Sequence, residues 1–167
     1  VNAVCTDIIL AITQNVAHAL VKRKIVDGKK VKVIHFGIDT EYFQPGNKKQ
    51  ARRALRLPQN NLIVTIVGRL DPIKDHMTFL EAALLVSKKY PDVRFFIVGS
   101  KLGDFSGKDD NNSYESRIKQ FVNKHRTLSK KIIWGGFIDD IASVYHATDI
   151  LVSTSLSESF GLAIGEA

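Results

Sequence analysis

Apolar and polar positions in the first third of the chain follow the periods of short strands and helices. Residues 7–13 form a nearly continuous apolar run, which predicts a buried strand. Residues 14–24 repeat apolar side chains at helical spacing, and residues 31–34 predict a second short strand. Residues 48–55 predict a basic helix that ends before Pro58.

From residue 62 onward the pattern becomes a regular alternation of apolar, β-branched runs and helical stretches. Strands are predicted at residues 62–67, 94–99, 131–134 and 150–152, the third ending at a Gly-Gly pair. Helices are predicted at residues 75–90, 113–125, 141–147 and from Gly161 onward, with a polar surface loop at 101–112. This alternation predicts an α/β fold with a doubly wound parallel Rossmann-like sheet. Because such sheets usually have about five or six strands, we expect the domain to be truncated.

The composition is that of a globular chain and excludes several other classes of protein. Hydrophobic residues make up 44% and charged residues 25% of the 167 positions, which excludes a coiled coil and a largely disordered chain. No apolar run approaches the roughly 18 residues of a membrane-spanning helix. The single cysteine, Cys5, excludes an internal disulfide framework, and the five histidines lack the spacing of metal ligands, so we expect no metal site.

The net charge of +7 is concentrated at one end of the chain. The first 57 residues hold eleven of the 24 Lys and Arg residues but only four of the 17 acidic ones. Such a basic segment could contact an anionic membrane surface or an acidic partner, or it could be an ordinary solvated face. No aromatic residues are interleaved with the charges for base stacking, so we expect no nucleic acid as a partner.

Small or polar residues follow each strand predicted in the second half of the chain. They are Gly68-Arg69, Gly99-Ser100, Gly135-Gly136 and residues 153–158. An open parallel sheet binds its ligands beyond the carboxyl ends of the strands, which is where these residues are expected. Any one of the glycines taken alone is equally well explained by an ordinary turn.

Two cations follow the first of these strands. Arg69 comes directly after it, and Lys74 lies just before the next predicted helix. A guanidinium fork beside a lysine point charge suits a diphosphate. The alternative is a set of surface ion pairs with Asp71 and Asp75.

Two carboxylates, Glu158 and Glu166, flank the start of the last predicted helix. Free backbone N–H groups around residues 160–162 would point at an anion, and the carboxylates would accept hydrogen bonds from hydroxyl groups. A sugar nucleotide offers these partners. For Glu166 alone, a favourable interaction with the helix dipole is the alternative explanation.

These motifs, in this order, resemble the retaining glycosyltransferases of family 4 (group 1). The resemblance rests on Val67-Gly68-Arg69-Leu70 with Lys74, on Gly135-Gly136-Phe137, and on Ser157 to Leu162 followed by Glu166-Ala167. The spacing of Glu158 and Glu166, with seven residues between them, is that family's signature. Residues 34–45 resemble the segment that links the two domains of the family, although Phe36 stands where Asn is common.

The resemblance implies a GT-B fold of two Rossmann-like domains that face each other across a cleft. Residues 1–45 would be the end of the N-terminal domain and the interdomain linker, and residues 46–167 part of the C-terminal nucleotide-sugar-binding domain. The implied activity is transfer of a sugar from a nucleotide-sugar donor to an acceptor, with retention of anomeric configuration and without a metal or other cofactor. The acceptor, which could be a glycan, a lipid or a small molecule, would bind mainly to the N-terminal domain, so we expect the chain alone to be inactive.

The resemblance also implies roles for individual residues. The catalytic residues would be Glu158 at the donor sugar and Arg69 and Lys74 at the diphosphate. Glu166 would bind the ribose, and the backbone around Gly136, Phe137 and Ile138 the base. The remaining donor-binding residues would be Gly68, Phe160, Gly161 and Leu162. Gly165, before Glu166, is smaller than the family usually has and would weaken that helix slightly.

Two other functions stay open at this point. One is a non-catalytic Rossmann-like module that binds an anionic polymer or lipid through the basic segment. The other is a different nucleotide-sugar enzyme of the same fold, such as an epimerase or a phosphorylase relative. We expect a cytoplasmic protein, with peripheral contact to the cytoplasmic face of a membrane as a further hypothesis. The sequence shows no basic-then-apolar leader, but it also lacks an initiator Met, so that absence says nothing about the full protein.

Overall fold

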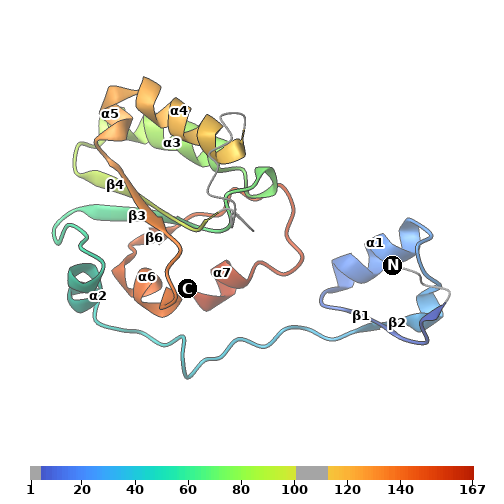
Figure 1. Ribbon diagram of the computed structural model, residues 1–167. Helices are drawn as coiled ribbons and strands as arrows, with labels where there is room; N and C mark the ends of the chain where they lie inside the picture. The colour runs from blue at the N-terminus through green and yellow to red at the C-terminus, as the bar shows by residue number, and fades with distance from the viewer. Residues whose placement is uncertain (1–4, 101–112) are drawn as a thin grey trace.

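The computed structural model describes residues 5–100 and 113–167. In them the chain forms two sheets, each built of parallel strands, and a linker joins the two (Figure 1). The first sheet has two strands, and the second has four in the order β5-β4-β3-β6. The loop predicted at residues 101–112 lies outside the described residues. No helix in the part of the chain that the structure describes is long and apolar enough to cross a membrane.

The N-terminal unit consists of β1 (Ile9–Ala11), α1 (Gln14–Lys22), the short 3₁₀ helix η2 (Gly28–Lys30) and β2 (Val31–Val33). The strand predicted at residues 7–13 is present but shorter, and the prediction that it is buried is wrong. Ile8 and Leu10 are 59% and 62% exposed, whereas Ala11 is buried. Side chains alternate across a strand, and α1 packs on one face of this two-stranded sheet. Ile8 and Leu10 lie on the face that no described element covers.

The second unit is built around the four-stranded sheet. Its elements are α2 (Lys48–Ala54), β3 (Leu62–Val67), η3 (Pro72–Lys74), α3 (His76–Lys89), β4 (Val93–Val98), α4 (Tyr114–Lys124), α5 (Arg126–Ser129), β5 (Ile132–Gly136), α6 (Ile141–Ala147), β6 (Ile150–Leu151) and α7 (Leu162–Glu166). All three strand pairings are parallel, with β3 and β4 in register from Leu62 opposite Val93 to Val67 opposite Val98. The predicted doubly wound α/β sheet is thus confirmed.

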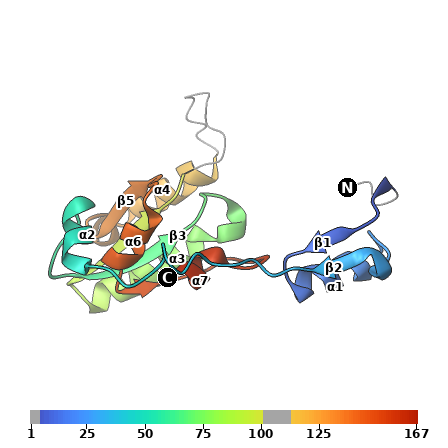
Figure 2. The same cartoon turned by 90° about the horizontal axis from the view of Figure 1, so that it is seen from below.

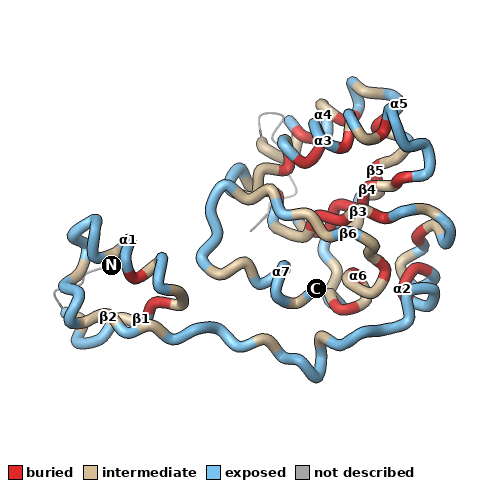
Figure 3. The backbone as a smooth tube through the Cα atoms, turned by 180° about the vertical axis from the view of Figure 1, so that it is seen from behind, coloured by how far each residue is buried: buried red, intermediate tan, exposed pale blue. Residues whose placement is uncertain are grey.

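Helices cover both faces of this sheet, which explains why its strands are apolar on both sides. α3, α4 and α5 lie on one face, and α2 and α6 on the other (Figure 1). Alternate residues of β4 serve the two layers: Phe95 and Ile97 pack with the first set of helices, Phe96 and Val98 with the second. The buried positions accordingly concentrate in and around β3 and β4 (Figure 3).

Several boundaries follow from local sequence signals. Asp75 and Ser113 cap α3 and α4 by accepting hydrogen bonds from the amides of Thr78 and Ser116, as their positions predicted. β5, in contrast, runs through Gly135 and Gly136, which were expected to end it. A Cβ at Gly135 would lie 2.7 Å from the ring of Phe96, so glycine lets this strand pass a bulky neighbour.

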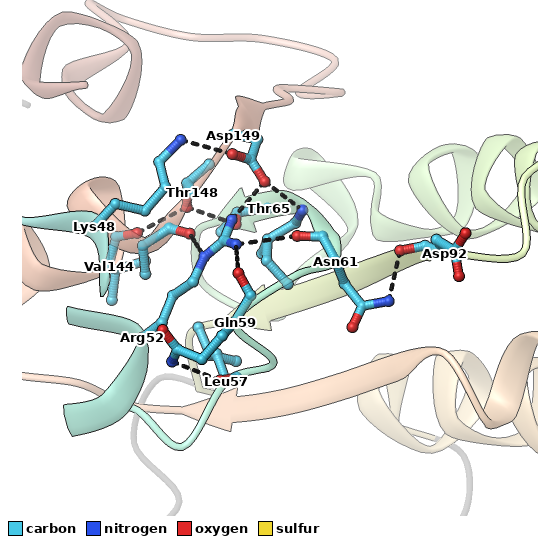
Figure 4. A network of polar contacts seen from close by, with 12 residues as sticks. Lys48, Arg52, Leu57, Gln59, Asn61, Thr65, Asp92, Val144, Thr148 and Asp149 are labelled. Atoms are coloured by element: carbon cyan, nitrogen blue, oxygen red, sulfur yellow. Dashed lines mark hydrogen bonds and ion pairs between the residues drawn. The ribbon is translucent and has the colours of Figure 1, made fainter. Parts of the chain in front are cut away.

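A buried arginine connects α2 to the sheet and to α6 (Figure 4). Arg52 is 4% exposed, and it donates hydrogen bonds to the carbonyls of Ala147, Gln59 and Asn61. Its guanidinium also pairs with Asp149, as does the ammonium of Lys48. The basic segment is therefore not simply a solvated face, because Arg52 is buried within the domain and Lys48 pairs with Asp149 at its surface.

Candidate functional site

Two adjoining cavities lie at the carboxyl ends of the four strands, where the sequence placed the ligand site. The first has a volume of about 390 Å³ and the second about 480 Å³. Both are lined by Val67, Gly68, Arg69 and Ile141, so they form one continuous cleft. The first cavity continues along residues 158–166 to Glu166, and the second continues along the ends of β4 and β5.

The floor of this cleft is backbone, because glycines stand at the strand ends. The amide of Gly68 donates to the carbonyl of Val98 over 2.9 Å, and the amide of Gly99 donates to that of Gly136 over 2.8 Å. A Cβ at Gly99, where φ is +141°, would lie 1.9 Å from the carbonyl oxygen of Gly68. Glycine at position 99 is therefore a requirement of close backbone approach and not only of turn formation.

Lys74 and Glu158, predicted from separate loops, meet in the first cavity. The Lys74 Nζ lies 2.5 Å from Glu158 Oε1, and the Ser155 hydroxyl donates to the same oxygen over 2.7 Å. Burial acts to raise the pKa of Glu158, but the hydrogen bonds from Lys74 and Ser155 outweigh it and lower the pKa. Glu158 is thus held as a carboxylate.

Of the alternative ion pairs suggested for the two cations, the one with Asp71 is present and the one with Asp75 is not. Arg69, whose side chain is 52% exposed, lies 3.3 Å from Asp71, an arrangement of little energetic weight. Asp75 caps α3 and has no ion pair with Lys74, whose partner is Glu158. The guanidinium of Arg69 stays accessible at the junction of the two cavities.

The loop between β6 and α7 holds the backbone of Lys74 in place. The Thr154 hydroxyl donates to the carbonyls of Lys74 and Asp75 over 3.1 and 2.9 Å, and the Leu156 amide donates to the carbonyl of Ile73. Asp75 itself has φ of +46°, an uncommon conformation for a residue with a side chain, which such contacts maintain. Thr154 carries no local sequence signal for this role, since its partners lie about 80 residues earlier.

His76, next to this segment, adds no charge to the site near neutral pH. Its side chain is fully buried, and its ring nitrogens have no hydrogen-bond partner among the described residues. Burial lowers its pKa, against the opposing charges of Asp71 and Asp75. The positive potential at the cavity therefore comes from Arg69 and Lys74.

Glu166 reaches the first cavity from α7, and its carboxylate has a partner that sequence reasoning missed. The hydroxyl of Tyr145, in α6, donates to Glu166 Oε2 over 2.7 Å. Burial first, and then the hydrogen bond and charge of Glu166, raise the pKa of Tyr145 far above its ordinary value. The phenol therefore stays protonated and remains a donor. The interpretation of Glu166 as a mere helix-dipole residue does not account for this contact.

The linker also contributes to the cleft. Phe36 lines the first cavity, and its ring meets that of Phe160 edge-on at a centroid distance of 6.0 Å. A Cβ at Gly165 would lie 2.4 Å from Ile38 Cδ1, so this glycine leaves room for the linker side chain. Figure 2 shows the linker passing α7 and α6 on its way to α2.

The structure thus brings together most of the residues that were predicted to bind a donor. Those in the first cavity are Gly68, Arg69, Lys74, Glu158, Phe160, Gly161, Leu162 and Glu166. Phe137 and Ile138 line the second cavity together with Ser100, which was expected at this edge of the sheet, and Asp139, which was not. Gly136 lies beside this cavity through its bond to Gly99. Among the described residues, no group of three or more His, Cys, Asp or Glu side chains is placed to hold a metal ion.

Comparison with known proteins agrees with this geometry. The chain is 33% identical over 164 residues to a D-inositol 3-phosphate glycosyltransferase of Mycobacterium sp. strain KMS, covering 96% of this chain and 35% of that protein. The structure of Anabaena HepE in complex with UDP-glucose matches with a TM-score of 0.80 and 26% identity, over 96% of this chain and 42% of that one. The C-terminal domain of LpcC from Francisella tularensis, a glycosyl transferase group 1 protein, matches with a TM-score of 0.65 and 34% identity, over 78% of this chain and 65% of that one.

The chain spans about a third of the length of the curated relatives that it matches. Its α/β unit, from residue 47 to residue 167, matches the family model of the glycosyl transferases group 1. This match covers the sheet, the cleft and all the cleft residues that follow the linker. The chain therefore belongs to the glycosyl transferases group 1 family.

Proposed function

We propose that the protein is a retaining glycosyltransferase that binds its nucleotide-sugar donor in this cleft. The observation that supports this most is the convergence of Arg69, Lys74, Glu158 and Glu166 on one cavity at the carboxyl ends of the strands. Two cations suit a diphosphate, and two carboxylates suit the hydroxyl groups of a sugar and a ribose. Anabaena HepE, a structural relative, was crystallised with UDP-glucose, which makes a uridine nucleotide the first donor to test.

In the proposed reaction the bond between the anomeric carbon and the phosphate oxygen breaks, and the acceptor oxygen bonds to the same carbon. Negative charge develops on the departing diphosphate. Arg69, at the junction of the cavities, and Lys74 would stabilise that charge, which is the kind of interaction that lowers a barrier most. Lys74 has three N–H donors, so contact with Glu158 leaves two of them for phosphate oxygens.

Glu158 is proposed to contact the donor sugar as a hydrogen-bond acceptor. Its bonds from Lys74 and Ser155 lower its pKa, so the carboxylate is a weak base for the acceptor proton. Both bonds end on Oε1, so Oε2 is left to accept a hydrogen bond from a sugar hydroxyl. We therefore propose that the acceptor proton passes to the departing phosphate.

The remaining parts of the donor would occupy the rest of the cleft. Glu166 would accept hydrogen bonds from the ribose, and the second cavity, with the backbone of Phe137 and Ile138, would take the base. Residues 1–45 would be the end of the acceptor-side domain and the linker, since β1 and β2 form a sheet of their own. A glycan, lipid or small-molecule acceptor is compatible with this arrangement.

The test is the ligand preference of the full-length protein. Titration calorimetry should show UDP binding more tightly than inorganic phosphate, a single-stranded oligonucleotide or anionic lipid vesicles. UDP-sugars should then be turned over in the presence of an acceptor, with the product keeping the anomeric configuration of the donor. Preference for the oligonucleotide or the vesicles over every nucleoside diphosphate would favour the non-catalytic binding module instead.

A further inference from the structure

A tyrosine outside the set of predicted donor residues makes the side-chain contact to Glu166. Tyr145 lies in α6, is half-buried, and lines the first cavity. Its hydroxyl donates to Glu166 Oε2 over 2.7 Å. Within the described residues this is the one hydrogen bond recorded for that carboxylate, so the orientation of Glu166 depends on it.

The contact has a clear chemical consequence for Glu166. A glutamate side chain has several rotatable bonds, and fixing it when a ligand arrives costs conformational entropy. The phenol engages one carboxylate oxygen and leaves Oε1 to accept from a hydroxyl group in the cavity. Glu166 is thus oriented by a contact within the protein itself.

Tyr145 is in turn held by the linker. The ring of Phe43 packs against it at a centroid distance of 5.9 Å. A cavity of about 400 Å³, lined by Phe43, Tyr145 and Glu166 among others, lies between the linker and α6 and α7. The linker and the Glu166 carboxylate therefore contact Tyr145 at two different parts of its side chain, the ring and the hydroxyl.

Neighbouring contacts fix the linker on α6. The Tyr42 hydroxyl donates to Asp140 over 3.3 Å, and His146 Nε2 lies 2.8 Å from the carbonyl oxygen of Gln44. A Cβ at Gly46 would lie 2.3 Å from the His146 ring, so the backbone lies directly against that side chain. Contacts of the residues before and after Phe43 thus fix its position on α6.

We propose that Tyr145 is a positioning residue of the donor site, which orients Glu166 for the ribose hydroxyls and is itself held by the linker through Phe43. The inference rests on the proposed function, because it takes Glu166 as the ribose contact. It adds a route by which the linker between the two domains sets the affinity and the ribose selectivity of the donor site.

The experiment compares UDP with 2′-deoxy-UDP and 3′-deoxy-UDP by titration calorimetry on the full-length protein. Tyr145→Phe keeps the ring and removes the hydroxyl. We expect it to weaken UDP binding about tenfold, the effect of losing one charge-assisted hydrogen bond, and to affect the deoxy analogue that lacks the Glu166-bound hydroxyl much less. The preference for the ribonucleotide should therefore fall. Phe43→Ala keeps the Tyr145 hydroxyl. It should lower the UDP affinity and the preference for the ribonucleotide by a smaller factor than Tyr145→Phe does.

Tyr90→Phe is the matched control. Tyr90 follows α3, is 49% exposed, and lines neither cavity of the cleft. Its substitution should leave UDP affinity and ribose selectivity unchanged. Thermal midpoints of all variants show whether the fold is intact.

The outcomes separate the inference from the function on which it rests. If Glu166→Ala weakens UDP binding but Tyr145→Phe leaves affinity and selectivity unchanged, the inference is wrong and the proposed function stands. A lower thermal midpoint for Tyr145→Phe without a change in selectivity also overturns it, since the hydroxyl would then be merely structural. If Glu166→Ala binds UDP and both deoxy analogues like the wild type, the ribose assignment itself fails.

Discussion

Arg69 and Lys74 both line the first cavity, and their removal should have similar effects. Arg69→Ala and Lys74→Ala in the full-length protein should each lower the transfer rate about a hundredfold, because each removes a charge from the proposed position of the diphosphate. Neither should unfold the protein, since the Arg69 side chain is 52% exposed and that of Lys74 is 23% exposed. Initial rates and UDP titrations measure the effect, with Lys49→Ala on the exposed face of α2 as the control. Wild-type rates in both variants would show that the diphosphate assignment is wrong.

The two carboxylates should differ in which step they affect. Glu158→Gln should lower kcat about tenfold while leaving UDP affinity nearly unchanged, because its proposed partner is the sugar and not the nucleotide. Glu166→Ala should instead weaken UDP binding, because its proposed partner is the ribose. Calorimetry with UDP, run beside rate measurements, distinguishes the two patterns. Equal losses of affinity and turnover in both variants would contradict the separate roles.

Sequence reasoning found the residues of the cleft but not their partners. Arg69, Lys74, Glu158 and Glu166 could be predicted because each follows or precedes a recognisable strand or helix. The partnership of Lys74 with Glu158 joins positions 84 apart, and that of Tyr145 with Glu166 joins different helices. Such contacts depend on how the loops pack in three dimensions, for which a local pattern holds no information.

Among the elements, α2 shows how a basic helix can be structural. Arg52→Ala should destabilise the protein by about 3 to 5 kcal/mol, because it leaves Asp149 and three carbonyl groups without their buried partner. Lys49→Ala, on the exposed face of the same helix, should change stability by less than about 0.5 kcal/mol. Chemical denaturation measures both. Equal stability of the two variants would mean that the Arg52 contacts contribute nothing net.

The same network makes a prediction about pH. Burial acts to raise the pKa of Asp149, but hydrogen bonds from Lys48, the Ile63 amide and Arg52 lower it below its ordinary value. A lowered folded-state pKa gives stabilisation that is present above the unfolded pKa of about 4 and is lost as the pH falls through the folded pKa. The stability difference between the wild type and Asp149→Asn should therefore be largest near pH 7 and shrink below about pH 4. A difference that stays constant over that range would exclude this linkage.

The strands and helices of the α/β unit were predictable because their patterns are unambiguous. β3 and α6 have the predicted bounds. The sequence of β3 is a continuous β-branched run, which favours a strand, and that of α6 is an amphipathic stretch with an N-cap, which favours a helix. The burial of residues 7–13 and the end of β5 were predicted wrongly. In both cases the outcome depends on neighbours, namely which faces are covered and whether glycine passes Phe96.

For the whole molecule, the question is what the uneven charge does. With Arg52 and Lys48 engaged with Asp149, the exposed cations of this region include Lys49, Arg53 and Arg56. If these contact an anionic membrane, the full-length protein should float with acidic liposomes at low salt and less so at high salt. Changing all three to Gln should reduce flotation without affecting turnover of a soluble acceptor. Flotation that is indifferent to the three changes would argue against this contact.

Gly99 has a consequence for genetics. A single added methyl group would meet the Gly68 carbonyl at 1.9 Å, and the backbone at φ of +141° disfavours any residue other than glycine. Gly99→Ala would therefore force the ends of β3 and β4 apart while every side chain of the cleft remains encoded. Under the proposed transferase function, a strain carrying this allele should lose the glycosylated product as a deletion strain does. A search of its genome for missing cleft residues would nevertheless find all of them present. Position 99 should therefore be inspected when a natural variant keeps Arg69, Lys74, Glu158 and Glu166 but lacks the product.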